Sequence, residues 1–198
     1  MDATVRSPYQ APEGPIEDSA GRKRKPFFLA PPAHKLAVMI VATLGLYLIW
    51  WFYRNWRAVQ RHEGRRRAPV WRAMFSFLFA HGLFKAINRI VAGHDATAHL
   101  KINAGGLAIA YAVLYLCAWL PPPYWLVFVS CLFPLLPVNA LARRYNEAID
   151  GDLHRAEDTF NMWNWLGIAL GGLFWLLILL GMVLTAIAAW LPAQDVSL

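Results

Sequence analysis

Two long stretches of the chain carry no ionised side chain. Residues 102–142, 41 in all, and residues 159–194, 36 in all, contain no Lys, Arg, Asp or Glu. A helix rises about 1.5 Å per residue, so roughly 20 apolar residues cross the ~30 Å hydrocarbon core of a bilayer. The first stretch therefore predicts two membrane crossings, and the second predicts one. The crossings of the first stretch are separated by Pro121, Pro122 and Pro123, which force a tight turn because proline cannot continue a helical hydrogen-bond ladder.

We expect an all-α protein built as a transmembrane helical bundle. Its three predicted crossings are residues 102–120, 124–142 and 165–190. Pro134 and Pro137 are expected to kink the second crossing. Residues 143–158, which follow it, are predicted to form a polar loop in water.

Residues 36–53 form a further apolar segment with Gly45 near its middle, and two arrangements stay open for it. If it is a fourth crossing and residues 71–91 do not cross, the basic N-terminal tail lies outside and 13 of the 19 Lys and Arg residues lie inside. If residues 71–91 cross as well, 12 lie inside and seven outside. The positive-inside rule barely separates these two counts. As a re-entrant helix, the segment enters the membrane and returns to the same side at Gly45. This keeps both basic flanks inside but exposes backbone unless other helices cover the bend.

Residues 71–91 predict an interfacial or re-entrant amphipathic helix rather than a full crossing. The segment is short, its centre holds His81 and Gly82, and its second half sets apolar residues against Lys85 and Arg89. Such a helix lies in the headgroup region with its apolar face buried.

The composition agrees with this class of protein. Hydrophobic residues make up 58% of the 198 residues and charged residues 16%, whereas soluble domains are near half apolar and about a quarter charged. Residues 1–35 are basic and Pro-rich with few apolar side chains, so we expect a disordered tail before a membrane-embedded helical domain over residues 36–198. Four consecutive cations at residues 22–25 indicate contact with anionic membrane lipids at the cytoplasmic face. They do not indicate nucleic-acid binding, since no nucleic-acid-reading module accompanies them.

Aromatic side chains alternate with cations where the first apolar segment ends. This pattern is typical of a helix leaving the hydrocarbon. The residues expected to anchor the membrane interface are Trp50, Trp51, Tyr53, Arg54, Trp56 and Arg57.

Six polar residues flank the inner ends of the predicted crossings, and they are Asn139, Arg143, Asn146, Lys101, Asn103 and Asn164. The first three recur at i, i+4 and i+7, so they share one face of a helix. If the crossings bundle together, all six meet near the cytoplasmic interface. They could then form a pocket for an anionic headgroup or a small polar solute, with Arg143 as the charged anchor. The alternative is that they cap helix ends and bond neighbouring helices.

No motif for a known type of catalytic site is present. Asp95 and His99 would share a face if they lay on one helix, but His94 would not join them, so a polar connector is favoured over a metal site. His94, Asp95 or His154 could act as a base on lipid headgroups, yet no nucleophile accompanies them. We therefore expect no catalytic residue, no metal and no cofactor.

Small residues on the predicted crossings allow close packing of helices. Gly167 and Gly171 are four apart with Gly172 adjacent, and Gly106 and Ala110 repeat the spacing. Backbones approach closely at such positions. The face could pack within the chain or form a homodimer.

Two motifs near the first apolar segment resemble a known signature. Residues 43–47 read TLGLY and residues 51–56 read WFYRNW. This resembles small, uncharacterised bacterial multi-pass inner-membrane proteins, in which TLGxY runs into WFY, a basic residue and NW. Residues 69–73 and 83–85 fit the same pattern. The resemblance implies a bacterial inner-membrane protein with several crossings and implies no activity.

The favoured function is therefore that of a non-enzymatic scaffold or accessory protein of a membrane complex. Its partners would be membrane lipids and either a membrane protein or a second copy of the chain. The alternative is binding or transport of a lipid headgroup or small polar solute through the polar residues at the cytoplasmic side.

Overall fold

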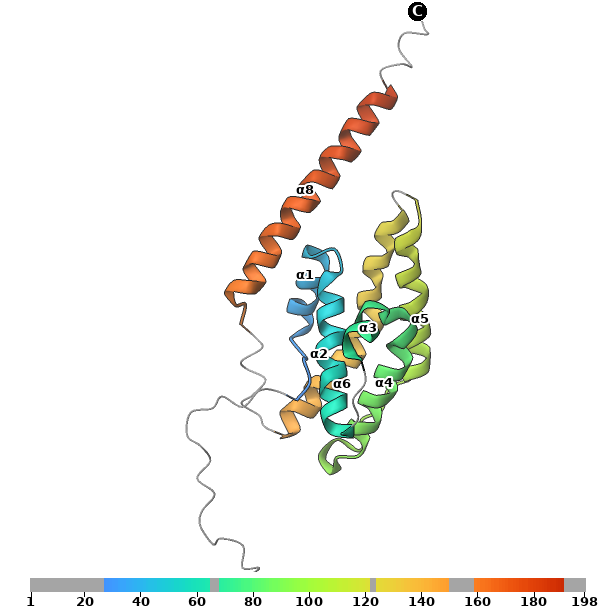
Figure 1. Cartoon of the computed structure of the whole chain (residues 1–198), viewed down its shortest axis with the longest axis vertical. Helices are drawn as coiled ribbons and strands as arrows, with labels where there is room; N and C mark the ends of the chain where they lie inside the picture. Colours follow the sequence, from blue (N-terminus) through green and yellow to red (C-terminus); the bar gives the residue numbers. More distant parts are fainter. Residues whose placement is uncertain (1–26, 65–67, 122–123, 150–158, 191–198) are drawn as a thin grey trace, which may run out of the picture.

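The computed structural model of the protein describes residues 27–64, 68–121, 124–149 and 159–190. Within these ranges the chain is almost wholly helical and has no strand, which confirms the all-α prediction. The elements, with η for a 3₁₀ helix, are α1 (Ala33–Ala42), α2 (Leu46–Glu63), α3 (Pro69–Met74), α4 (Ser76–Ala92), η1 (Asp95–Thr97), α5 (Ala104–Leu116), η2 (Cys117–Trp119), η3 (Tyr124–Cys131), α6 (Leu132–Ile149) and α8 (Met162–Trp190). The elements from α1 to α6 form a bundle, and α8 rises away from it (Figure 1).

The chain reverses between α1 and α2, so one continuous helix over residues 36–53 is wrong. The Gly45 N–H donates to the Ile40 carbonyl over 2.8 Å, a bond that closes the end of a helix. Leu44 and Gly45 are both left-handed, with φ of 50° and 83°. A Cβ at Gly45 would lie 2.7 Å from the Phe128 ring, so space as well as backbone conformation requires glycine there. The return at Gly45 that the re-entrant arrangement requires is therefore present.

Residues 71–91 also fold as more than one helix. α3 and α4 are separated at Phe75, and α4 then packs along α5 and against α2 and α6. Leu83, Phe84 and Ile87 are fully buried in this contact. The amphipathic pattern therefore turns an apolar face toward the bundle, and the position of α4 at a membrane interface stays a prediction.

α5 and α6 run antiparallel, so the chain reverses between Pro121 and Tyr124 (Figure 1). Pro134 lacks the N–H that would bond the Ser130 carbonyl, so the α-helical ladder cannot continue from α6 back into η3. α6 continues to Ile149, beyond the predicted end of its crossing. The predicted polar loop over residues 143–158 is thus helical at its start, and its remainder lies outside the described residues.

Large aromatic side chains pack in the interior of the bundle. Trp51 and Phe52 of α2, Phe84 of α4 and Tyr111 of α5 are each fully buried. The Phe52 ring centroid lies 5.2 Å from that of Tyr111 and 6.1 Å from that of Phe84. The buried Tyr111 hydroxyl shares a 2.9 Å hydrogen bond with the Ser76 hydroxyl. These aromatic contacts therefore join α2, α4 and α5 within a core to which α1 and α6 also contribute.

α8 contacts the bundle chiefly through α1 (Figure 1). Gly171 is the one buried residue among its 29. A Cβ at Gly171 would collide with the Ala42 carbonyl oxygen, so the two backbones touch. One turn further along, Trp175 Nε1 donates to the Val41 carbonyl over 2.8 Å. The small-residue face of this helix therefore packs against α1 of the same chain.

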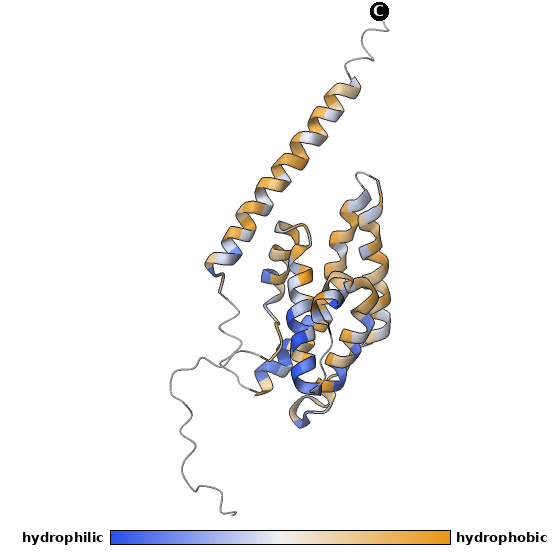
Figure 2. Ribbon diagram, viewed as in Figure 1, coloured by the Kyte–Doolittle hydropathy of each residue, from blue (hydrophilic) through white to orange (hydrophobic). Residues whose placement is uncertain are grey.

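Two helical segments are long and apolar enough to cross a membrane. They are Tyr124–Ile149, which combines η3 and α6, and Met162–Trp190, which is α8. Figure 2 shows apolar residues along α8 and in the upper parts of the bundle, while hydrophilic residues gather at the lower ends of α2 and α4. We call this lower end the polar end. Length, composition and this separation favour membrane association.

Candidate functional site

Buried asparagines hold a non-helical segment, residues 27–32, at the polar end. Asn146 bonds both polar groups of the Phe28 backbone: its Oδ1 accepts from the N–H over 3.0 Å, and its Nδ2 donates to the carbonyl over 2.8 Å. Asn55 forms the same pair with Leu29, with both distances 3.1 Å. Together with Asn139 they form what we call the asparagine clamp.

Asn139 completes the clamp from about two turns earlier on α6 than Asn146. Its Nδ2 donates to the Pro31 carbonyl over 2.7 Å, and its Oδ1 accepts from Trp51 Nε1 over 3.0 Å. The three clamp side chains are at most 2% exposed. Asn139 and Asn146 thus bond backbone groups of residues 27–32, and Asn139 also bonds α2 through Trp51. Asn55 was not among the predicted site residues, because it lies within an aromatic and basic motif.

The other predicted pocket residues lie in separate surroundings. Arg143 forms a 3.1 Å ion pair with Glu147 on α6. Asn103 caps the N-terminus of α5, where its Oδ1 accepts a backbone N–H over 3.0 Å. Lys101 is exposed, and Asn164 lies in the first turn of α8. Among the described residues, the contacts given for these side chains do not join all six to one another, and their binding of a ligand stays a prediction.

α2 divides the predicted interface anchors between two faces. Those on the outer face are Trp50, Tyr53, Arg54 and Arg57. Their cations lie over their aromatic rings, each 5.8 Å from a ring centroid. Trp51 and Trp56 are 0% and 1% exposed, so their side chains lie in the core of the bundle, and a role as interface anchors stays a prediction. The helical period turns both of them into the bundle.

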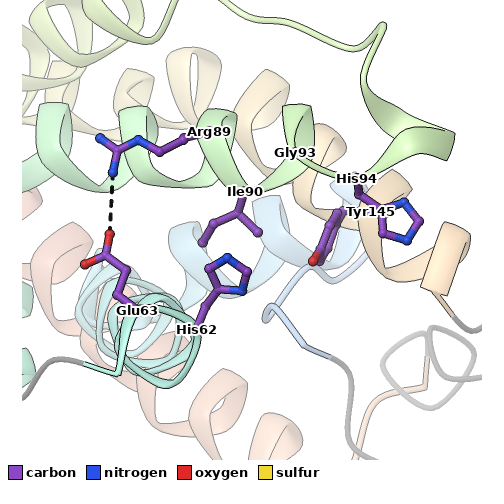
Figure 3. A pocket seen from close by; sticks show the side chains of 7 residues that line it. All are labelled: His62, Glu63, Arg89, Ile90, Gly93, His94 and Tyr145. Atoms are coloured by element: carbon purple, nitrogen blue, oxygen red, sulfur yellow. Dashed lines mark ion pairs between the residues drawn. The ribbon is translucent and has the colours of Figure 1, made fainter.

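Three helices surround a cleft of about 580 Å³ at the polar end (Figure 3). Glu63 Oε1, at the end of α2, lies 3.7 Å from Arg89 Nη1 of α4. The Arg89 side chain is 70% exposed, whereas that of Glu63 is 19% exposed. We call this the polar cleft; its lining is His62, Glu63, Arg89, Ile90, Gly93, His94 and Tyr145.

Two helix C-termini border the polar cleft. α2 ends at Glu63 with Gly64 as its C-cap, and α4 ends at Ala92 with Gly93 as its C-cap. The C-terminus of a helix carries roughly half a negative charge on its unpaired carbonyls. The cleft therefore offers a cation at Arg89, an anion at Glu63 and the negative ends of two helices.

Aromatic contacts join the polar cleft to the clamped segment. The Phe27 ring packs edge-on against His62 and Tyr145, with centroid distances of 6.0 and 5.5 Å. Tyr145 in turn meets the His94 ring at 5.7 Å. In the described part of the chain, His94 Nδ1 is buried and has no hydrogen-bond partner. The cleft thus has an aromatic wall and one polar atom able to accept a further bond.

Positive charge gathers on α2 beside the polar cleft. Desolvation by burial, followed by repulsion from Arg54 and Arg57, lowers the pKa of Arg61 below its ordinary value. Arg61 Nη2 lies 3.4 Å from the Phe27 carbonyl, to which it donates. This cation therefore helps to hold the clamped segment at the edge of the cleft.

Asp95 and His99 do not lie on one regular helix. Asp95 begins η1, which ends at Thr97, and His99 lies in the turn that follows. The condition under which Asp95 and His99 would share a helix face is therefore not met. Among the described residues, no group of three His, Cys, Asp or Glu side chains could hold a metal ion. His154 lies outside the described residues.

Sequence reasoning missed the polar cleft because its charged pair comes from distant parts of the chain. Glu63 and Arg89 belong to different helices, and only the packing of the bundle brings them together. No protein family, curated protein or solved structure matches this chain. Its class therefore rests on its own residues: a helical protein with two segments able to cross a membrane. The resemblance based on TLGLY and WFYRNW stays a prediction.

Proposed function

We propose that this chain is a bacterial multi-pass inner-membrane protein that acts as a non-enzymatic accessory or scaffold of a membrane complex. α8 is the observation that carries the proposal. Gly171 alone among its 29 residues is buried, and large apolar side chains are exposed along its whole length. Burying one such side chain is worth about 1.5–3 kcal/mol. A lipid environment, a partner helix or both would supply that burial.

The arrangement of the hairpins supports a topology with all 19 Lys and Arg residues on one side. The reversal at Gly45 returns α2 to the end from which α1 starts. The bonds between Phe28 and Asn146 bring the N-terminal tail to the inner end of α6. With α5, α6 and α8 as the crossings, the outer turn and the C-terminus carry no Lys or Arg. This satisfies the positive-inside rule better than a fourth crossing would.

The free part of α8 supports the scaffold role. Residues 179–190 are all exposed, while the first half of the helix is held by α1. One apolar helix can thus pack on its own bundle near the inner side and on a partner near the outer side. The proposed partner is a transmembrane helix of another membrane protein, with a second copy of this chain as the alternative.

Reporter fusions test the topology. A reporter after Ser19 should report the cytoplasm, and one after Leu198 should report the periplasm. Periplasmic activity after Ser19 would exclude the re-entrant arrangement.

Photo-crosslinking in cells tests the scaffold role. A photoreactive residue at Leu180 or Val183, both half exposed on the free part of α8, should give one discrete adduct with another protein. The matched control is Ile168, which faces a groove next to α1 and should yield no such adduct. If both distal positions capture only lipid, the scaffold role is refuted.

The polar cleft supports a second function, the binding of a lipid headgroup or a small polar solute. It has opposite charges at Glu63 and Arg89, and it lies at the end of the bundle proposed to face the cytoplasm. Loss of binding on changing Glu63, but not Arg143, would assign this function to the cleft rather than to the residues predicted from sequence.

A further inference from the structure

We propose that the polar cleft binds a zwitterion that carries a primary ammonium and a phosphate, the chemistry of phosphoethanolamine. The inference rests on the second proposed function and does not require a protein partner for α8. The proposed binding site consists of the residues that line the polar cleft, and each of its charged groups contacts one part of the ligand.

The charges of the cleft favour a ligand of both signs. An anion alone would bind Arg89 but meet the Glu63 carboxylate and two helix C-termini. A cation alone would bind Glu63 but meet the Arg89 guanidinium. A zwitterion satisfies both sites, with its ammonium at Glu63 and the end of α2 and its phosphate at Arg89.

The Glu63–Arg89 pair leaves room for such a ligand. Its 3.7 Å separation is longer than the roughly 2.7–2.9 Å of a tight charge-assisted hydrogen bond. The guanidinium is mostly exposed and has five N–H donors, so it can turn toward a phosphate. A ligand can therefore come between Glu63 and Arg89 without breaking a tight hydrogen bond between these two side chains.

The size of the cleft and its walls fit a small polar group. Its volume of about 580 Å³ lies within the range of roughly 300–1,000 Å³ for small-molecule sites. His62 points into it toward Ile90 and Tyr145 (Figure 3). The unpartnered His94 Nδ1 adds a polar atom in the wall behind Tyr145.

The position along α2 places the cleft at headgroup depth. The outward Trp50, Tyr53, Arg54 and Arg57 form the proposed interface belt. Glu63 lies six residues beyond Arg57, which is about 9 Å along the helix axis. Two sources then share the ligand chemistry: the headgroup of phosphatidylethanolamine and free phosphoethanolamine.

The experiment uses the full chain purified in a mild detergent. Calorimetry with phosphoethanolamine, ethanolamine and inorganic phosphate should show the zwitterion binding at least about tenfold more tightly than either half. Native mass spectrometry should show retention of phosphatidylethanolamine over phosphatidylglycerol. Glu63→Gln and Arg89→Gln should each weaken binding by about tenfold or more. Arg144→Gln and Glu147→Gln, which remove the same charges from exposed positions at the same end, should leave binding unchanged.

Calorimetry and native mass spectrometry together distinguish the lipid headgroup from free phosphoethanolamine. Lipid retention without binding of free phosphoethanolamine assigns the lipid headgroup, and binding of the free compound without lipid retention assigns the solute. Equal binding of inorganic phosphate or phosphatidylglycerol overturns the proposal, as does the absence of binding in both measurements. Circular dichroism checks that each variant keeps its helical content. If Arg89→Gln does not fold, Glu63→Gln decides, because unchanged zwitterion binding by that variant is sufficient to refute the site.

Discussion

Replacing Gly171 with Ala should detach α8 from α1. A Cβ at this position would overlap the Ala42 carbonyl oxygen, and backbone on both sides leaves no side chain free to give way. α8 must then recede by about 2 Å to reach an ordinary contact distance. That shift breaks the 2.8 Å bond from Trp175 Nε1 to the Val41 carbonyl. Overpacking costs typically 1–3 kcal/mol and a hydrogen bond between membrane helices about 0.6–1.7 kcal/mol, so the contact should lose roughly 2–5 kcal/mol.

The adjacent glycine provides a matched control. A Cβ at Gly172 meets nothing within 4 Å, so Gly172→Ala should keep α8 in place. Spin labels at Ile109 and Leu180, which are both exposed, report the distance between the bundle and α8 by pulsed electron resonance. Gly171→Ala should broaden and lengthen this distance, whereas Gly172→Ala should leave it unchanged. Identical distributions for both variants would refute the close α1–α8 packing.

Two further predictions concern the hairpin and the clamp. Asn146→Ala should lower the free energy of unfolding in detergent by about 2–6 kcal/mol, because the buried N–H and carbonyl of Phe28 both lose their partner. Thermal unfolding measures this loss of stability. A loss below about 1 kcal/mol would contradict the clamp. Leu44→Gly should raise stability by roughly 1 kcal/mol, since Leu44 has φ of 50°, whereas Gly45→Ala should lower it. A lower melting temperature for Leu44→Gly would show that the turn is not left-handed.

The elements predicted best from the sequence are those with strong local signals. α8 follows from an apolar run with no charge, and the turn of the α5–α6 hairpin follows from consecutive prolines. The reversal at Gly45 emerged only as one of two arrangements. Its helix end is closed by Leu44, and a leucine in a left-handed conformation gives no recognisable sequence signal.

The faces of α2 were harder to predict because the same residue types serve two purposes. Aromatic residues and cations predicted an interface belt, and Trp50 and Tyr53 do face outward. Trp51 and Trp56 are of the same type, but the helical period places them in the core. Asn55 belongs to the same motif, but it lies on the buried face of α2 and bonds the Leu29 backbone.

The polar residues at the helix ends were predicted as candidate site residues. Their contacts in the folded bundle could not be predicted from the sequence. Asn139 and Asn146 share a helix face as expected, yet both bond backbone groups of residues 27–32, more than 100 positions away. The Glu63–Arg89 pair likewise depends on how α2 packs on α4. Contacts of this kind are set by the packing of the whole bundle rather than by local propensity.

The asparagine clamp and the polar cleft act as one structural unit because they share a wall. Phe28 is fixed by Asn146, and the adjoining Phe27 ring supports His62 and Tyr145, which line the cleft. Releasing the segment would leave the Asn146 amide unpaired and remove Phe27 from behind both rings. The bonds that bring the N-terminal tail to the inner end of the bundle therefore also set the shape of the cleft. It follows that a ligand in the cleft and the clamped segment should stabilise each other, since each preserves the walls that the other requires.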